Sequence, residues 1–177
     1  MIDIIQWGLN KDSSGPVATI PAKDPKAMKG AQLVYEGGIH MMHGAGLGSS
    51  FYGTDGRVEC HRGRLGLWLG DKHVAGNQGG KKVNLNQELD RIEAEYLKDA
   101  KVKLYDSNNH VGDFLNSMQS RKKPITNEIV GARTSIACHL LNQTYYNQEA
   151  IAWNPQKNTF AKGGDPKWLT RNYRGQW

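Results

Sequence analysis

The stretch that decides the fold reads VKLYDSNNHVGDFLNSMQSRKKP over residues 102–124 and NEIVGARTSIACHLLNQTYYNQEAIAWNPQKNTF over residues 127–160. Its first part carries apolar residues at i, i+3, i+4 and i+7, namely Val111, Phe114, Leu115 and Met118. This spacing predicts an amphipathic helix of roughly three turns. Ser107 or Asn108 is placed to cap its start, and Pro124 prevents its continuation.

A second helix is predicted after Thr126 or Asn127, either of which can cap its first turn. Its apolar residues form one wide face: Ile129, Val130, Ala132, Ile136, Ala137, Leu140 and Leu141. Because this face is so wide, we expect the helix to be largely buried. Residues 149–153 then predict a short strand, which Asn154-Pro155 ends.

The residues before this stretch predict short strands joined by tight turns. An opening helix, with Ile2, Ile5 and Leu9 on one face, is ended by the break at 13–16. Strand-like runs follow at 17–20, 31–36, 39–43, 50–53, 57–61 and 65–69. The turns between them contain residues that allow positive φ: Gly37-Gly38, Asp55-Gly56 and Gly63. We therefore expect an antiparallel meander.

The rest of the chain completes an α+β prediction. Residues 70–84 are rich in Gly, Lys and Asn and predict an exposed loop. Another helical face follows, with Asn86 as its cap, and comprises Leu89, Ile92, Tyr96 and Leu97. The expected fold is therefore α+β, an open, predominantly antiparallel β-sheet with helices packed on one face. Length favours one domain over residues 1–177.

The composition limits which kinds of binding partner are expected. The net charge of +6 and pI of about 9.3 permit acidic partners, but the basic residues form short clusters without an aromatic platform. We therefore expect no nucleic acid, and no apolar run is long enough for a membrane span. Cys60 and Cys138 fit no zinc spacing, and no export signal opens the chain. Localisation is open: the cytoplasm is favoured, and the periplasm is the alternative if an export signal lies upstream.

Two Gly-rich segments were considered as phosphate-binding loops. Residues 44–48 give G-x-G-x-G and precede strand-like sequence, and residues 76–80 precede Lys81-Lys82-Val83. A dinucleotide site needs a strand, a Gly-rich turn and a helix start in that order. Neither segment leads into a helix, so the chain is predicted to carry no cofactor-binding residues. His40 and His43 lie three apart on a predicted strand and point to opposite faces, which disfavours a metal site.

The order and spacing of several residues resemble the C-terminal half of the Gfo/Idh/MocA family of oxidoreductases, in its bacterial branch. A block like N-x-H-x-x-x-F-L and then S-R-K-x-P is carried here by Asn108, His110, Phe114, Leu115, Ser120, Arg121, Lys122 and Pro124. The likeness continues through Gly131, Arg133, Cys138, His139, Leu140, Asn142, Trp153-Asn154-Pro155, Tyr173, Arg174 and Trp177. Residues 1–8, MIDIIQWG, are similar to the family's H-x-x-D-I-x-Q-W element, which follows its nucleotide-binding domain.

The resemblance implies a substrate-binding and oligomerisation domain of an NAD(P)-dependent oxidoreductase acting on a sugar, glycoside or polyol. The family's Rossmann domain, with its Gly-rich loop and catalytic lysine in Glu-Lys-Pro, is absent from this chain. NAD or NADP is implied for the intact enzyme, and none is expected to bind this chain alone, which should be inactive. The implied partners are the sugar or polyol substrate, a homo-oligomer formed through the sheet face, and a separate Rossmann domain. The alternative is a free-standing carbohydrate-binding or assembly module without redox activity.

Asp3 is the candidate catalytic residue. It matches an aspartate that lies beside the substrate carbon in related family members, where a carboxylate accepts a hydrogen bond from the reacting hydroxyl. The alternative is an aspartate stabilised in the first helical turn. Trp7 stands where several members place a histidine or tyrosine. Because indole cannot exchange a proton at neutral pH, the acid–base role falls elsewhere, and Trp7 is expected in the core or as a sugar-stacking wall.

The remaining candidate substrate-binding residues are His110, Arg133, His139 and Asn142. His110 is near a helix start, whereas His139 and Asn142 could together line the substrate cleft. A hydrogen-bonded core histidine is the alternative for His139. Arg133 could pair with an acidic neighbour or with a substrate oxygen. The chain reads Gly131-Ala132-Arg133 where a G-H-R pattern is common in the family, which weakens any transfer of a role to that turn.

Overall fold

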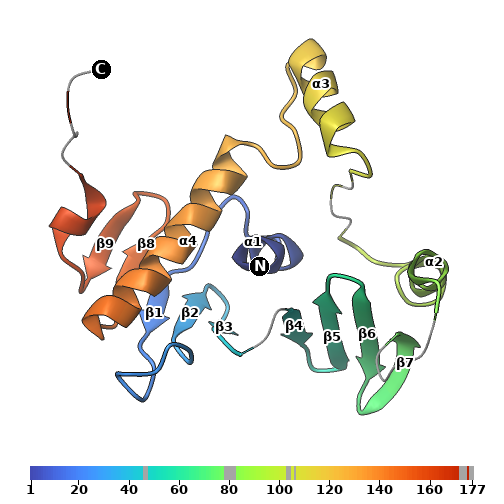
Figure 1. The fold of residues 1–177 in the computed structure, drawn as a ribbon, viewed down its shortest axis with the longest axis horizontal. Coiled ribbons are helices and arrows are strands. Elements are labelled where there is room, and N and C mark those ends of the chain that lie inside the picture. The colour runs from blue at the N-terminus through green and yellow to red at the C-terminus, as the bar shows by residue number, and fades with distance from the viewer. Residues whose placement is uncertain (46–47, 78–82, 103–104, 106, 172–174, 176–177) are drawn as a thin grey trace. The chain divides into compact units, whose positions relative to one another are not determined.

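A computed structural model describes residues 1–177 except 46–47, 78–82, 103–104, 106, 172–174 and 176–177 (Figure 1). The chain divides into two compact units. The five-stranded unit comprises Ile2–Ala45 and Tyr105–Trp177, and the four-stranded unit comprises Gly46–Leu104 with Met1. The expected α+β class with antiparallel pairing is confirmed. Its strands form two sheets, whereas the sequence analysis expected one.

The sheet of the five-stranded unit combines segments from both ends of the chain. Its strands are β1 (Ala18–Ile20), β2 (Gln32–Tyr35), β3 (Ile39–Met42), β8 (Ala152–Asn154) and β9 (Thr159–Lys162). They lie in the order β3-β2-β1-β8-β9, and every neighbouring pair is antiparallel. Gly37 and Gly38, with φ of 88° and 75°, make the expected turn between β2 and β3. The sequence analysis did not predict β9, which has a single large apolar residue, Phe160.

Two helices, α1 (Ile2–Gly8) and α4 (Glu128–Asn147), pack together, and α4 also contacts β1 and β2 (Figure 1). The core consists of Ala31, Leu33, Tyr35, Met41, Ala137, Leu140, Leu141, Ile151 and Trp153. As predicted, the apolar face of α1 joins this core, through Ile2, Ile5 and Leu9. Gln6 adds a polar contact, because its Oε1 accepts a 3.5 Å hydrogen bond from the Tyr35 hydroxyl.

The expectation that α4 is largely buried was wrong. Asn127 caps the helix, as one of the two candidates, but the buried residues all lie between Ala137 and Thr144, and none lies in the first nine residues. Ile129 is exposed near its start. The 20-residue helix is about 30 Å long, whereas strands of three or four residues span only about 10–13 Å. The short sheet therefore covers only part of the helix.

After β9, a short 3₁₀ helix, η2 (Pro166–Leu169), lies near the C-terminus. The predicted amphipathic helix is α3 (His110–Ser120). Its cap is Asn109 rather than Ser107 or Asn108, because the Asn109 side chain reaches the Gly112 amide at 2.9 Å. The helix ends before Arg121, which adopts a left-handed φ of 59°. None of its residues is buried.

The four-stranded unit is an antiparallel meander with a helix. It contains β4 (Ser49–Tyr52), β5 (Gly56–His61), β6 (Arg64–Leu69), β7 (Lys72–Gly76) and α2 (Leu85–Tyr96), with the strands in chain order. The meander was predicted, but β7 was expected to be loop and Asn86 to be the cap of α2. Asn84 caps the helix instead, because its side chain accepts hydrogen bonds from the amides of Asn86 and Gln87.

Contacts from α2 explain why the polar segment KHVAG forms a strand. Glu88 Oε1 accepts a 2.8 Å hydrogen bond from the Gly76 amide, and Arg91 donates to the Val74 carbonyl at 2.9 Å. The Arg91 guanidinium, with the Gly76 amide, lowers the pKa of Glu88 to about 2. These hydrogen bonds and pairing with β6 stabilise a strand that lacks an apolar alternation.

A buried hydroxyl pair joins α4 to the sheet and makes a testable contribution to stability. The Oγ1 atoms of Thr144 and Thr19 are 2.5 Å apart, and Thr19 Oγ1 also accepts the Ile151 amide at 3.2 Å. We expect Thr144→Val to lower the free energy of unfolding by about 1–3 kcal/mol, because Thr19 loses a buried partner. Urea unfolding followed by circular dichroism measures this change.

Ser135→Ala is the matched control. Thr144 Oγ1 also donates to the carbonyl one turn earlier in α4, Leu140 O, at 2.8 Å. Ser135 makes the same type of bond, from Oγ to Gly131 O at 2.8 Å, but is exposed. Its loss should cost less than about 0.5 kcal/mol. Equal destabilisation by the two substitutions would show that the buried pair has no special role.

Candidate functional site

Asp3 and Trp7 form the first part of the candidate site. They lie four residues apart in α1, so they share one side of the helix. Both are exposed, and Trp7 keeps 39% of its surface accessible. Trp7 is therefore not a core residue. An exposed aspartate is ionised at neutral pH, so this side of α1 presents a carboxylate acceptor beside the apolar face of an indole.

The packing of α1 on α4 brings Asp3 towards the middle of the long helix. Burial raises the pKa of the Cys138 thiol, and the negative charge of Asp3 raises it further. Burial and the charge of Asp3 likewise raise the pKa of Asp12. The charge of Asp3 thus acts on Cys138, the residue that precedes His139 in the sequence of α4.

His139 and Asn142 lie on the solvent-facing side of α4. They are three residues apart and both are exposed, whereas Ala137, Leu140 and Leu141 are buried. His139 is therefore not a buried core histidine. The structure brings an imidazole and a carboxamide, two groups that can donate hydrogen bonds to hydroxyl oxygens, onto one face of the helix against which α1 packs.

Arg133 and His110 have different surroundings. The Arg133 guanidinium donates to the Pro155 carbonyl and, at 2.9 Å, to Asn158 Oδ1, so it holds the turn between β8 and β9. His110 is the exposed first residue of α3, a helix that packs extensively on no other helix or strand of the described residues. The structure therefore does not add these two residues to the group on α1 and α4.

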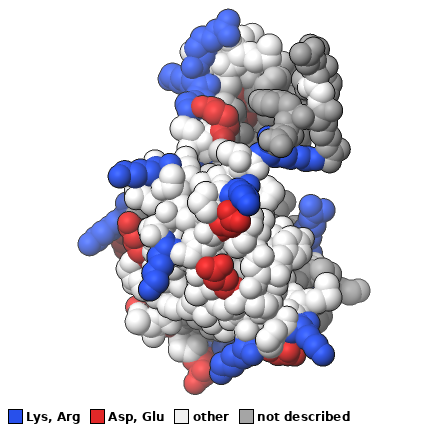
Figure 2. Space-filling view, turned by 90° about the vertical axis from the view of Figure 1, so that its left-hand side faces the viewer, with Lys and Arg blue, Asp and Glu red and all other residues white. Residues whose placement is uncertain are grey.

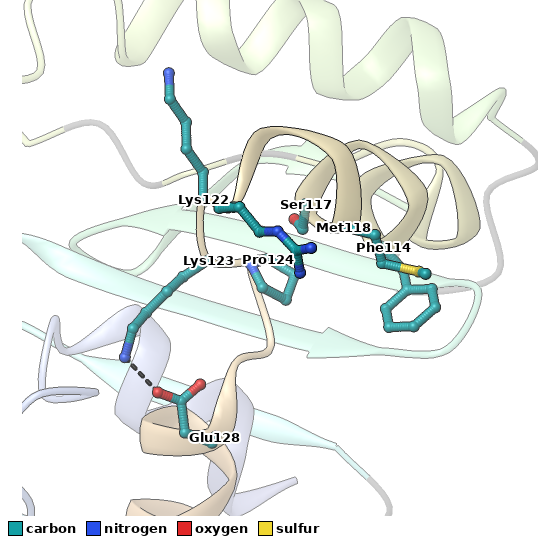
Figure 3. Close-up of a pocket in the computed structure, with 8 residues that line it drawn as sticks. Phe114, Ser117, Met118, Lys122, Lys123, Pro124 and Glu128 are labelled. Atoms are coloured by element: carbon teal, nitrogen blue, oxygen red, sulfur yellow. Dashed lines mark hydrogen bonds and ion pairs between the residues drawn. The ribbon is translucent and has the colours of Figure 1, made fainter.

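A groove of about 300 Å³ lies at the C-terminal end of α3 and was not predicted as a site (Figure 3). Its lining consists of Phe114, Ser117, Met118, Arg121, Lys122, Lys123, Pro124 and Glu128. Figure 3 shows the Phe114 ring beside the Met118 thioether, Lys123 directed at Glu128, and Lys122 extending away from that ion pair. The sequence signal was present, because an Arg-Lys-Lys run follows directly on an apolar helical stripe.

Metal and membrane sites are not supported within the described part of the chain. No group of three or more His, Cys, Asp or Glu side chains there could hold a metal ion. None of the helices in that part combines the length and the apolar character needed to cross a bilayer. Cationic and anionic side chains are interspersed over the face shown in Figure 2.

Asp113 gives the groove region a pH-dependent element. Its carboxylate accepts hydrogen bonds from the Tyr105 hydroxyl at 2.6 Å and from the Ile125 amide at 2.9 Å, and these bonds lower its pKa. The folded-state pKa is thus below the unfolded value of about 3.9, so the tether is complete above about pH 4 and is lost as the pH falls through the lowered pKa.

The expected result is an Ile125 amide resonance that stays unchanged down to about pH 4 and shifts only at lower pH. A pH titration by NMR measures it, and Asp113→Asn should remove the transition. A midpoint at or above the ordinary aspartate pKa would contradict the prediction.

Comparison with known proteins gives no match to a protein-family model, to a curated protein or to a solved structure.

Proposed function

We propose that this chain is the substrate-binding and oligomerisation part of an NAD(P)-dependent oxidoreductase that acts on a sugar, glycoside or polyol. The observation that carries the proposal is the placement of Asp3 and Trp7 on one exposed side of α1. A sugar offers both hydroxyl donors and an apolar ring face, and these two side chains match both. The order of family-like residues from Asn108 onward supports the same conclusion.

In the proposed site, the Asp3 carboxylate accepts a hydrogen bond from the hydroxyl whose carbon is oxidised. The Trp7 indole orients the substrate by contact with its apolar face, and it takes no part in proton transfer. His139 and Asn142 supply hydrogen bonds to further hydroxyl groups from α4. Arg133 acts by holding the β8–β9 turn, and the position of His110 on α3 assigns it no contact with this substrate.

Neither Gly-rich segment is followed directly by a helix in the described residues. Residues 44–48 lead into β4, a strand, so no helix start follows them. Gly76 ends β7 and donates its amide to Glu88, and α2 begins only at Leu85. A nicotinamide cofactor, which would accept the hydride, is therefore assigned to a separate nucleotide-binding domain.

The outer face of the five-stranded sheet supports the oligomerisation part of the proposal. Ile20 and Met42 flank Gln32 in the strand register, and they are 38% and 63% exposed. Their neighbours on the same strands, Thr19 and Met41, are buried on the opposite face. These two exposed apolar side chains on either side of Gln32 also favour the second candidate, an assembly or carbohydrate-binding module without redox activity.

Binding of small polyhydroxylated ligands tests the site. We expect a member of a panel of monosaccharides, methyl glycosides and polyols to bind the chain saturably. Asp3→Asn should weaken this binding by about 10- to 100-fold, because a hydrogen bond to a charged group contributes about 1.5–3 kcal/mol. Saturation-transfer NMR and calorimetry measure both effects.

Asp24→Asn is the matched control, because Asp24 is an exposed carboxylate whose only hydrogen bond found within the described residues is with the Lys26 amide. It should leave binding unchanged. If no ligand in the panel binds, or if the two variants behave alike, the proposed site is wrong.

The redox role and the alternative module differ in what accompanies the chain. A Gly-rich βαβ segment with a Glu-Lys-Pro motif encoded in frame upstream of Met1 would favour the oxidoreductase. Sugar binding without such a segment, and without sugar-dependent reduction of NAD⁺ or NADP⁺ by the protein as the cell makes it, would favour the module.

A further inference from the structure

The apolar residues of α3 form an uncovered surface. Val111, Phe114, Leu115 and Met118, here called the α3 stripe, are 56%, 57%, 53% and 54% exposed. We propose that the α3 stripe, together with Arg121 and Lys122, is a docking site for a protein segment that has an apolar face bordered by carboxylates. This proposal does not depend on the redox proposal, because it concerns a different helix and a different ligand.

The helix is held in one conformation although little packs on it. An isolated helix of 11 residues is marginal in water, since about 12–15 residues are needed even for favourable sequences. Asn109 caps its start, and the Arg121 amide donates to the Ser117 carbonyl at 2.9 Å at its end. Asp113 ties it to Ile125. These interactions lower the cost of ordering the stripe when a partner binds.

The charges beside the stripe define the partner's chemistry. Lys123 forms an ion pair with Glu128, whereas Arg121 and Lys122 form none within the described residues. Both cations line the same groove as Phe114 and Met118. A partner segment that lies over the groove could place its carboxylates near the two cations and its apolar side chains against Phe114 and Met118.

A second copy of the chain does not provide those carboxylates. In a two-fold dimer through the α3 stripe, each copy offers the same patch to the other. The acidic residues of that patch, Asp113 and Glu128, already bind Tyr105 with Ile125 and Lys123, respectively. A copy would therefore bring Arg121 and Lys122 of both chains together without counter-charges.

An anionic membrane surface is also a poorer match. Helices that lie on membranes carry many Lys and Arg residues along the polar face. The sequence of α3, HVGDFLNSMQS, contains neither, and its polar face includes Asp113. The cations lie only beyond one end of the stripe, where they can meet localised carboxylates.

Two synthetic amphipathic peptides with the same leucine stripe test the proposal with the full chain. One has Glu and the other Lys at the positions that border the stripe. By fluorescence anisotropy, the Glu peptide should bind saturably and at least tenfold more tightly than the Lys peptide. Phe114→Ser with Leu115→Ser should weaken binding of the Glu peptide at least tenfold, and Arg121→Asn with Lys122→Glu should abolish its advantage.

Leu89→Ser is the matched control, because Leu89 is an equally apolar, 49% exposed residue on α2. It should not change binding. Circular dichroism checks the fold of each variant. If the double serine variant unfolds, the binding measured for the variant of the exposed pair Arg121 and Lys122 decides the outcome.

Three results would overturn the proposal. The first is failure of the Glu peptide to bind, or equal binding of both peptides. The second is dimerisation in sedimentation that Phe114→Ser abolishes, which would assign the surface to a second copy. The third is Phe114-dependent binding to phosphatidylserine–phosphatidylcholine vesicles with no binding of the Glu peptide, which would assign it to a membrane.

Discussion

The hydrogen bond between the hydroxyls of Thr19 and Thr144 is the interaction on which the five-stranded unit depends. It connects residues separated by 125 positions, and through the Ile151 amide it also includes the segment that leads into β8. Both threonines are buried, so each hydroxyl requires a partner inside the protein. The pair fixes α4 on the sheet, and α1 packs on α4. The packing of α1, which carries Asp3 and Trp7, on the helix that carries His139 and Asn142 is therefore linked to an interaction in the core.

The candidate surfaces differ in how the fold supports them. The group on α1 and α4 lies on two helices that pack against each other, one of them anchored to a buried core. The α3 stripe belongs to a helix stabilised by its caps and by one carboxylate tether. Small-ligand recognition needs fixed geometry, which the first arrangement provides. The α3 stripe lacks packing against the rest of the protein, and a protein partner could supply that packing when it binds.

Much of the fold could be predicted because the relevant signals are local. Strands β1 to β6 and all four α-helices follow from apolar spacing and turn glycines. The helix caps were less predictable, because adjacent asparagines such as Asn108 and Asn109 have equal propensities and only backbone geometry selects one. Strand β7 needed Glu88 and Arg91 from another element. Asp3 and Trp7 were singled out through the family resemblance, and their shared helix side became apparent only in the structure. The exposure of the α3 stripe could not be predicted, since periodicity does not reveal what covers a face.

The use of asparagine at helix starts affects how the chain would age chemically. Asn84, Asn109 and Asn127 cap α2, α3 and α4 through their side-chain oxygens. Deamidation to aspartate would keep an oxygen acceptor at each cap and add a negative charge at the positive end of the helix dipole. Deamidation that yields aspartate would therefore support these helix starts, whereas the isoaspartate product, with its extra backbone carbon, would disturb them. Each event would also remove one unit of the net charge of +6, so the aged chain would become less basic while the helices with an aspartate cap remained capped.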